Sequence, residues 1–201
     1  MARRPDPARK PELLAEIVEH LRTRSLPTLS FRRLATALDV SPFTLVYHFG
    51  TRNELILEII KAVQSRQQDV IDVELAEEPS LEAHIAAIRA SWANSLLPET
   101  RALLRLEFEA ALMEVTDPEL EAGGRSVHAR WVQWGAEALE RLGVPRPEAE
   151  IESRTLVDQI YGCQLDLVLT RDDAAASAAF ERALESYRTR VGELLASSLA
   201  R

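Results

Sequence analysis

The residues from 30 to 55 constrain the fold most, because they predict two short helices joined by a tight turn and then the start of a third helix. Ser30 is a favourable N-cap, since its hydroxyl can accept a hydrogen bond from a free backbone N–H of the first turn. Apolar residues then recur at the spacing of one helical face, at Phe31, Leu34, Ala35 and Leu38. Ser41 and Pro42 mark the start of the second helix, since proline at the first helical position loses no hydrogen bond.

Asp39 and Val40 form the expected turn between these helices. Aspartate tolerates the left-handed backbone conformation that a tight turn needs, although glycine is better suited to it. Val40 is expected to fill the angle between the two helices.

The second helix is expected from about Pro42 to His48. Leu45 and Phe49 lie four residues apart, so both are expected to face inward. The other side of the helix carries Phe43, Thr44, Tyr47 and His48. Aromatic rings, a hydroxyl and an imidazole can contact base edges, thymine methyl groups and phosphates. Because a short helix held across another by a tight turn fits the major groove, this segment predicts a DNA-reading unit.

The third helix is predicted to begin directly after Gly50. Thr51 and Glu54 form the Thr-x-x-Glu pattern of a capping box. Arg52 lies in the first turn, where the helix dipole disfavours a cation. A nearby DNA phosphate is therefore the expected reason for the arginine.

These features together resemble the N-terminal domain of the TetR family of bacterial transcriptional regulators. The residues that carry the resemblance are Leu34-Ala35, Leu38, Val40-Ser41, Thr44-Leu45, Tyr47-His48-Phe49, Thr51-Arg52 and Glu54-Leu55. The resemblance covers residues 11 to about 65 and rests beyond that on length and helical layout. It implies a dimeric regulator that binds operator DNA and a small-molecule effector.

Three positions depart from the family pattern. The family usually has glycine where Asp39 stands and lysine where Arg52 stands, and the latter change keeps the charge. It usually has tyrosine where Val46 stands. The phosphate contact of that tyrosine is either lost in this chain or made by Tyr47.

The expected DNA contacts come from both helices of the reading unit and the start of the third. The predicted DNA-binding residues are Arg32, Ser41, Pro42, Phe43, Thr44, Tyr47, His48 and Arg52. The alternative is a helical hairpin that packs against another protein, which would make the chain an acidic helical adaptor.

The charge of the chain is divided between its segments. Residues 1–52 contain nine Lys or Arg and five Asp or Glu, whereas residues 53–201 contain 15 and 27, and the net charge is −8. The basic segment suits the phosphate backbone, and the acidic remainder would be held away from it. A basic arm among prolines precedes the first helix and either follows DNA or is disordered, and it contains Arg3, Arg4, Arg9 and Lys10.

Composition indicates a reducing compartment and no membrane segment. The single Cys allows no internal disulfide, which is typical of a cytoplasmic protein. The arginine-rich start lacks the apolar stretch of a signal peptide, and no run approaches the ~20 apolar residues of a membrane helix.

The chain is predicted to be all-α, with about nine helices and no strands. The helices are expected at about 11–24, 31–38, 42–48, 51–73, 81–96, 99–115, 117–142, 148–170 and from 174 nearly to the end. In the helix at 117–142, a loosening at Gly123-Gly124 is left open. Residues 1–52 would form a three-helix DNA-binding domain with its arm. Residues 53–201 would form a helical domain for effector binding and dimerisation.

The last two expected helices carry apolar stripes, which predict a four-helix dimer interface. The candidate dimerisation residues are Ile160, Cys163, Leu167, Leu184, Tyr187 and Val191. The alternative is that both stripes pack within one chain. Gly162 in mid-helix costs about 1 kcal/mol relative to alanine, which a close helix crossing would explain.

The resemblance also implies an effector pocket among the helices of the second domain. The candidate lining residues are Trp92, Phe108, Leu112, Trp131, Trp134, Asp158 and Tyr161. This lining favours an apolar or aromatic effector, although each tryptophan is also explained by an ordinary core. Asp158 needs either a cationic partner or a pocket. His84 and His128 are expected on the surface.

No catalytic or metal-binding pattern is present in the sequence, so no enzymatic activity, metal or cofactor is expected. The chain lacks a Gly-x-Ser-x-Gly elbow, a phosphate-binding glycine-rich loop and a zinc-type Cys/His cluster. The sequence therefore predicts a homodimeric repressor that a small molecule releases from its operator.

Overall fold

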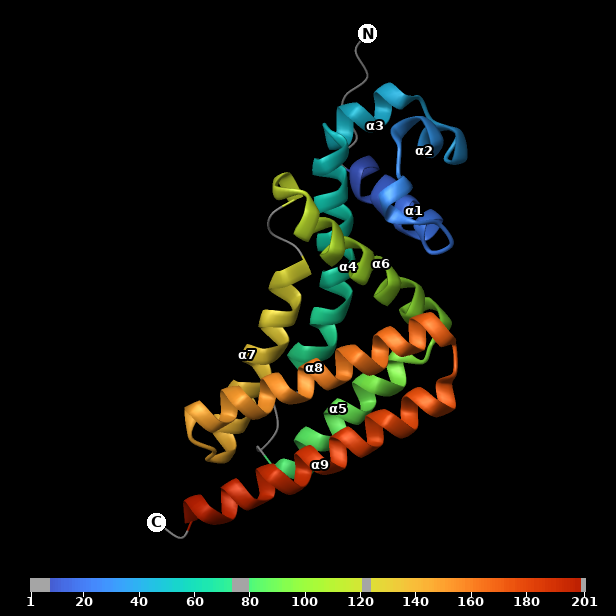
Figure 1. Ribbon diagram of the computed structural model, residues 1–201. Coiled ribbons are helices and arrows are strands. Elements are labelled where there is room, and N and C mark those ends of the chain that lie inside the picture. The colour runs from blue at the N-terminus through green and yellow to red at the C-terminus, as the bar shows by residue number, and fades with distance from the viewer. Residues whose placement is uncertain (1–7, 74–79, 121–123, 200–201) are drawn as a thin grey trace. The chain divides into compact units, whose positions relative to one another are not determined.

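The computed structural model describes residues 8–73, 80–120 and 124–199, and all regular elements in these ranges are helical (Figure 1). The chain forms two compact units. The first consists of Met1–Gln68 and Leu106–Gly124, and the second consists of Asp69–Arg105 and Arg125–Arg201. The expected boundary at residue 52 concerns function and stays a prediction.

Nine α-helices and two 3₁₀ turns lie in the described ranges, as the helical periodicity predicts. The early elements are α1 (Arg9–Leu21), η1 (Leu26–Thr28), α2 (Phe31–Ala37), α3 (Pro42–Phe49) and α4 (Arg52–Val73). They are followed by α5 (Leu81–Ser95), α6 (Pro98–Thr116), η3 (Pro118–Leu120), α7 (Gly124–Leu142), α8 (Arg146–Thr170) and α9 (Asp173–Leu199). None of these described helices combines the length and apolar character that a membrane crossing requires.

The predicted helix caps are confirmed. Ser30 Oγ accepts a hydrogen bond from the backbone N–H of Arg33 at 3.4 Å, and Ser41 Oγ accepts one from Thr44 at 3.0 Å. The capping box is reciprocal, because Glu54 accepts from the Thr51 N–H at 2.6 Å and Thr51 accepts from the Glu54 N–H at 3.2 Å. These bonds fix the starts of α2, α3 and α4.

One predicted helix is divided. The expectation of a single helix from 117 to 142 is wrong, because Pro118–Leu120 forms a 3₁₀ turn and α7 begins at Gly124. Asp117 Oδ1 accepts from the Glu119 N–H at 3.1 Å, a local bond that competes with helix formation. The basic arm is expected to precede the first helix, but its Arg9 and Lys10 belong to α1, and its residues 3 and 4 lie outside the described residues.

Buried apolar side chains of the first unit come from every helix in it. The buried residues include Leu13, Ile17 and Leu21 of α1, Leu34 of α2, Leu45 and Phe49 of α3, and Leu55, Ile56 and Ile59 of α4. The C-terminal part of α6 adds Leu106 and Ala110. Glu109 of this part accepts from the Leu26 N–H at 2.7 Å, so η1 is held to α6.

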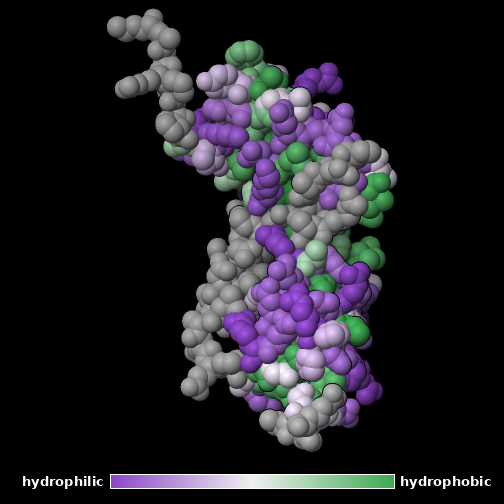
Figure 2. Space-filling model, turned by 90° about the vertical axis from the view of Figure 1, so that its left-hand side faces the viewer, coloured by the Kyte–Doolittle hydropathy of each residue, from purple (hydrophilic) through white to green (hydrophobic). Residues whose placement is uncertain are grey.

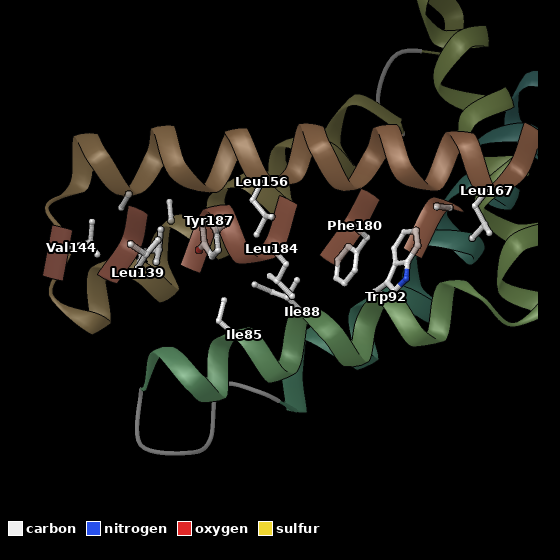
Figure 3. Packing of buried hydrophobic residues seen from close by; sticks show 14 residues of the cluster. Ile85, Ile88, Trp92, Leu139, Val144, Leu156, Leu167, Phe180, Leu184 and Tyr187 are labelled. Atoms are coloured by element: carbon white, nitrogen blue, oxygen red, sulfur yellow. The ribbon is translucent and has the colours of Figure 1, made fainter. Parts of the chain in front are cut away.

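The second unit has its own core, in which α9 supplies the central apolar stripe (Figure 3). The indole of Trp92 on α5 stacks on Phe180 of α9, with ring centroids 4.5 Å apart and planes at 7°. Trp92 Nε1 donates to Ser177 Oγ at 3.1 Å, which satisfies its buried polar atom. Trp92 is therefore a core residue, in agreement with the ordinary interpretation of this tryptophan.

Four of the six predicted dimerisation residues are also core residues. The side chains of Leu167, Leu184, Tyr187 and Val191 are 0% exposed and pack within the second unit. The prediction that they contact a partner subunit is wrong, because no surface of these side chains remains to be covered. Ile160 and Cys163 pack only partly against the same cluster.

His84 is buried, which corrects the expectation of a surface residue. Its Nε2 lies 2.9 Å from the hydroxyl of Tyr187, so α5 and α9 share a buried polar contact. Burial lowers the pKa of His84 to about 4, and the charge of Arg141 lowers it further in the same direction. The histidine is thus neutral in the folded chain at neutral pH.

This burial predicts a stability that decreases as the pH falls. In the unfolded chain His84 takes up a proton near pH 6.5, whereas the folded chain resists protonation down to about pH 4. From pH 7 to pH 5, the free energy of unfolding of the wild type should decrease by about 2 kcal/mol more than that of His84→Leu. Urea denaturation at both pH values measures this difference, and equal decreases in the two proteins would contradict the assignment.

Candidate nucleic-acid interface

The turn between α2 and α3 has the predicted backbone conformation. Asp39 has a positive φ of 51°, the left-handed conformation expected of this residue. The Leu38 N–H donates to the Leu34 carbonyl at 2.9 Å, and the Val40 N–H donates to the Ala35 carbonyl at 3.0 Å. Backbone hydrogen bonds thus terminate α2 and fix the direction in which the chain enters α3.

The two faces of α3 have opposite environments. Leu45 and Phe49 are buried, as predicted from their spacing. On the other face, the exposed fractions are 76% for Phe43, 47% for Val46 and 61% for Tyr47. In the upper part of the space-filling view, hydrophobic surface lies among hydrophilic surface (Figure 2).

His48 and Val46 complete this outer face. His48 is half-buried, and its ring meets the ring of Tyr47 edge-on with centroids 5.0 Å apart. Val46 is absent from the predicted contact set, although its spacing of three residues from Phe43 places it on the same face. Helical spacing could therefore have identified Val46.

The side-chain hydroxyls at the start of α3 form the N-cap hydrogen bonds of this helix. Ser41 and Pro42 are exposed and Thr44 is half-buried. Thr44 Oγ1 and Ser41 Oγ lie 2.8 Å apart, and Ser41 Oγ also accepts from the Thr44 N–H. Both hydroxyls therefore serve the local structure.

Gly50 ends α3 in a conformation that requires glycine. Its φ is 68°. A Cβ at this position would collide with the carboxylate of Glu54, the group that caps α4. Hydrogen bonds from Thr51 to this carboxylate lower the pKa of Glu54. The glycine thus permits the short connection from α3 to α4.

The guanidinium groups of Arg32 and Arg52 differ in their hydrogen bonding. Arg32 is exposed, and its guanidinium has no ion-pair or hydrogen-bond partner among the described residues. Arg52 instead donates from Nε to the Leu29 carbonyl at 3.0 Å and from Nη2 to the Pro27 carbonyl at 2.9 Å. These bonds explain a cation in the first turn of α4 without DNA, so a phosphate contact of Arg52 stays a prediction.

The predicted effector residues do not all lie in one unit. Phe108 and Leu112 belong to the first unit, where Leu112 is exposed. Trp131 and Trp134 belong to α7 in the second unit, with their rings edge-on and centroids 5.8 Å apart. Trp134 Nε1 is buried and has no hydrogen-bond partner in the part of the chain that the structure describes.

Asp158 lies near the cation of Arg154 and beside the ring of His128, so the first of the two outcomes expected for it is found. Its Oδ1 lies 2.6 Å from His128 Nε2, and its Oδ2 lies 3.8 Å from Arg154 Nε. Tyr161 packs edge-on against the His128 ring with centroids 5.2 Å apart. Both Asp158 and the guanidinium of Arg154 are exposed, whereas His128 is partly buried between α7 and α8.

A shallow groove of about 570 Å³ runs between α8 and α9. It is lined by Gln159, Gly162, Cys163, Asp166, Ala179, Arg182, Ala183 and Ser186. A Cβ at Gly162 would meet no atom within 4 Å, so no helix crossing within the chain explains this glycine. Burial raises the pKa of the Cys163 thiol, which disfavours the reactive thiolate.

The structure is similar to solved structures of several bacterial transcriptional regulators. A transcriptional regulator from Rhodococcus sp. Rha1 is 20% identical, covers 94% of this chain and 97% of its own, and has a TM-score of 0.70. A TetR transcriptional regulator from Legionella pneumophila is 16% identical, with 96% and 98% covered and a TM-score of 0.69. A TetR-family regulator from Agrobacterium tumefaciens is 13% identical, with 90% and 98% covered and a TM-score of 0.71.

No protein-family model matches the chain, and no curated protein matches it. The structural likeness nevertheless extends over nearly the whole length of both chains in each comparison. The chain therefore has the fold of the TetR-family transcriptional regulators.

Proposed function

We propose that the protein is a DNA-binding transcriptional regulator that inserts α3 into the major groove. The outer face of α3 carries this proposal, because Phe43, Val46 and Tyr47 remain exposed while Leu45 and Phe49 anchor the helix. Large apolar side chains exposed together on a soluble unit mark interaction surfaces. Arg32 on α2 supplies an exposed cation for the phosphate backbone.

The regulator acts as a homodimer in this proposal. One short reading helix gives limited affinity, and a two-fold dimer places two of them at half-sites about 34–36 Å apart. The groove between α8 and α9 supports a partner at this face, because Gly162, Ala179 and Ala183 allow close approach. Asp166 and Arg182 in the same groove carry opposite charges, which a two-fold contact can pair across subunits.

Release by a small apolar or aromatic effector completes the proposal. The unpartnered Trp134 Nε1 supports an effector that also offers one hydrogen-bond acceptor, since a buried donor without a partner costs free energy. The effector would bind more tightly to a conformation in which the reading helices are displaced. The free energy of DNA binding would be weakened by the difference between the effector's binding free energies for the two conformations. Repression followed by release is the direction of regulation that the family resemblance favours.

Substitution of the exposed Arg32 on α2 tests DNA binding. Arg32→Ala should weaken binding to duplexes of any sequence and reduce the slope of log affinity against log salt by about 0.9 per bound subunit. Fluorescence anisotropy with a labelled duplex from the region upstream of the gene, over a series of salt concentrations, measures both quantities.

Lys61→Ala is the matched control, because it also removes an exposed cation. Lys61 lies nine residues after Arg52 on α4, about 14 Å along the helix axis from the end of α4 that follows α3. The salt slope of Lys61→Ala should equal that of the wild type. An unchanged slope for Arg32→Ala would contradict the phosphate contact, and no binding of the wild type to duplex DNA would favour a protein-binding adaptor instead.

The groove between α8 and α9 gives a test of dimerisation. Ala183→Glu places a charge in the groove and should convert a dimer into a monomer of 22.5 kDa with weaker DNA binding. Ala178→Glu is the same change at an exposed position of α9 outside the groove, and it should leave the dimer intact. Light scattering after size-exclusion chromatography measures the masses, and a dimer that survives Ala183→Glu would place the interface elsewhere.

A further inference from the structure

The reading helix lacks every side chain that recognises purines through paired hydrogen bonds. Its sequence from Pro42 to Phe49 contains no Arg, Lys, Asn, Gln, Asp or Glu. In the major groove, guanine is typically read by Arg or Lys, adenine by Asn or Gln, and cytosine by Asp or Glu. The common hydrogen-bond codes are therefore absent from α3.

The aliphatic hydroxyls of Ser41 and Thr44 are engaged within the protein. Ser41 Oγ accepts from the Thr44 N–H and also pairs with Thr44 Oγ1 at 2.8 Å. His48 is half-buried beside Tyr47. What α3 offers to a groove is consequently dominated by Phe43, Val46 and Tyr47, the residues with the large exposed fractions.

The side chains of Phe43, Val46 and Tyr47 are close enough together to face two to three base pairs. Val46 and Tyr47 lie three and four residues after Phe43, so they are neighbours of it on one helical face, with Cβ atoms about 5–6 Å apart. Base pairs of B-DNA are stacked about 3.4 Å apart, so the three side chains together span two to three of them. Thymine alone of the four bases presents a methyl group to the major groove.

We propose that this protein selects its DNA by apolar contact of Phe43 and Val46 with thymine C5-methyl groups. The inference rests on the proposed insertion of α3 into the major groove and specifies what α3 reads there. Phe43 supplies the largest apolar contact, and the edge of the Tyr47 ring makes a further apolar contact. The preferred half-site is one with thymines at two neighbouring or alternate positions.

Removal of the methyl groups tests this recognition. A duplex is selected with the wild-type protein from a random-sequence library and is then made with deoxyuridine at single thymine positions. Uracil keeps the O4 acceptor and the pairing with adenine, so each replacement deletes only one methyl group. At the contacted thymines we expect an affinity loss of about four-fold per methyl group.

Variants assign the contact to a side chain. Phe43→Ala should bind the thymine and uracil duplexes equally at the position that Phe43 reads, and its exposure means that the fold does not depend on it. Arg32→Ala should weaken binding to both duplexes by the same factor and leave their ratio unchanged. The ratio of affinities therefore separates base reading from phosphate contact.

Two outcomes would overturn the inference in different ways. If the wild type binds the selected duplex tightly but equally well with uracil at every thymine position, methyl recognition is wrong and the proposed regulator function stands. If no duplex is enriched from the library, both the inference and the proposed function are wrong, and a protein becomes the partner of the exposed face of α3.

Discussion

The anchoring of α3 by Leu45 and Phe49 is the constraint on which the interface depends. These two side chains are buried against the first unit and thereby fix which face of a short, eight-residue helix points outward. An isolated helix of this length is unstable in water, so its conformation depends on caps and packing. Ser41 at its start and Gly50 at its end supply the caps, and the neighbouring capping box secures α4 immediately afterwards. The exposed aromatic face is thus held in a defined orientation by the protein itself.

The second unit is organised around the apolar stripe of α9. Phe180, Leu184, Tyr187 and Val191 are fully enclosed by α5, α7 and α8, so they stabilise one chain (Figure 3). The face of α9 toward the groove has small side chains, such as Ala179 and Ala183. In the proposed dimer, the contact between subunits lies at this groove and leaves the apolar core of each chain covered.

Local signals in the sequence predicted the reading unit closely, whereas spacing alone could not assign the partners of apolar stripes. Ser30, Ser41 and the Thr51–Glu54 pair act through neighbours three residues away, so their hydrogen bonds follow from sequence. The α9 stripe has the same period whether it faces its own chain or another, and burial resolved it in favour of the chain. His84 was placed wrongly because its partner Tyr187 lies 103 positions along the sequence. The bonds of Arg52 to Pro27 and Leu29 were likewise beyond a local pattern.

Photo-crosslinking from position 43 tests the central claim most directly. A photoreactive benzophenone amino acid replaces Phe43 in the full chain, and the same amino acid at the exposed position of Ala178 on α9 serves as the control. With the selected duplex bound, irradiation should attach the DNA bases to the protein through position 43 and not through position 178. Tight binding of the duplex without a crosslink from position 43 would contradict the insertion of α3 into the groove.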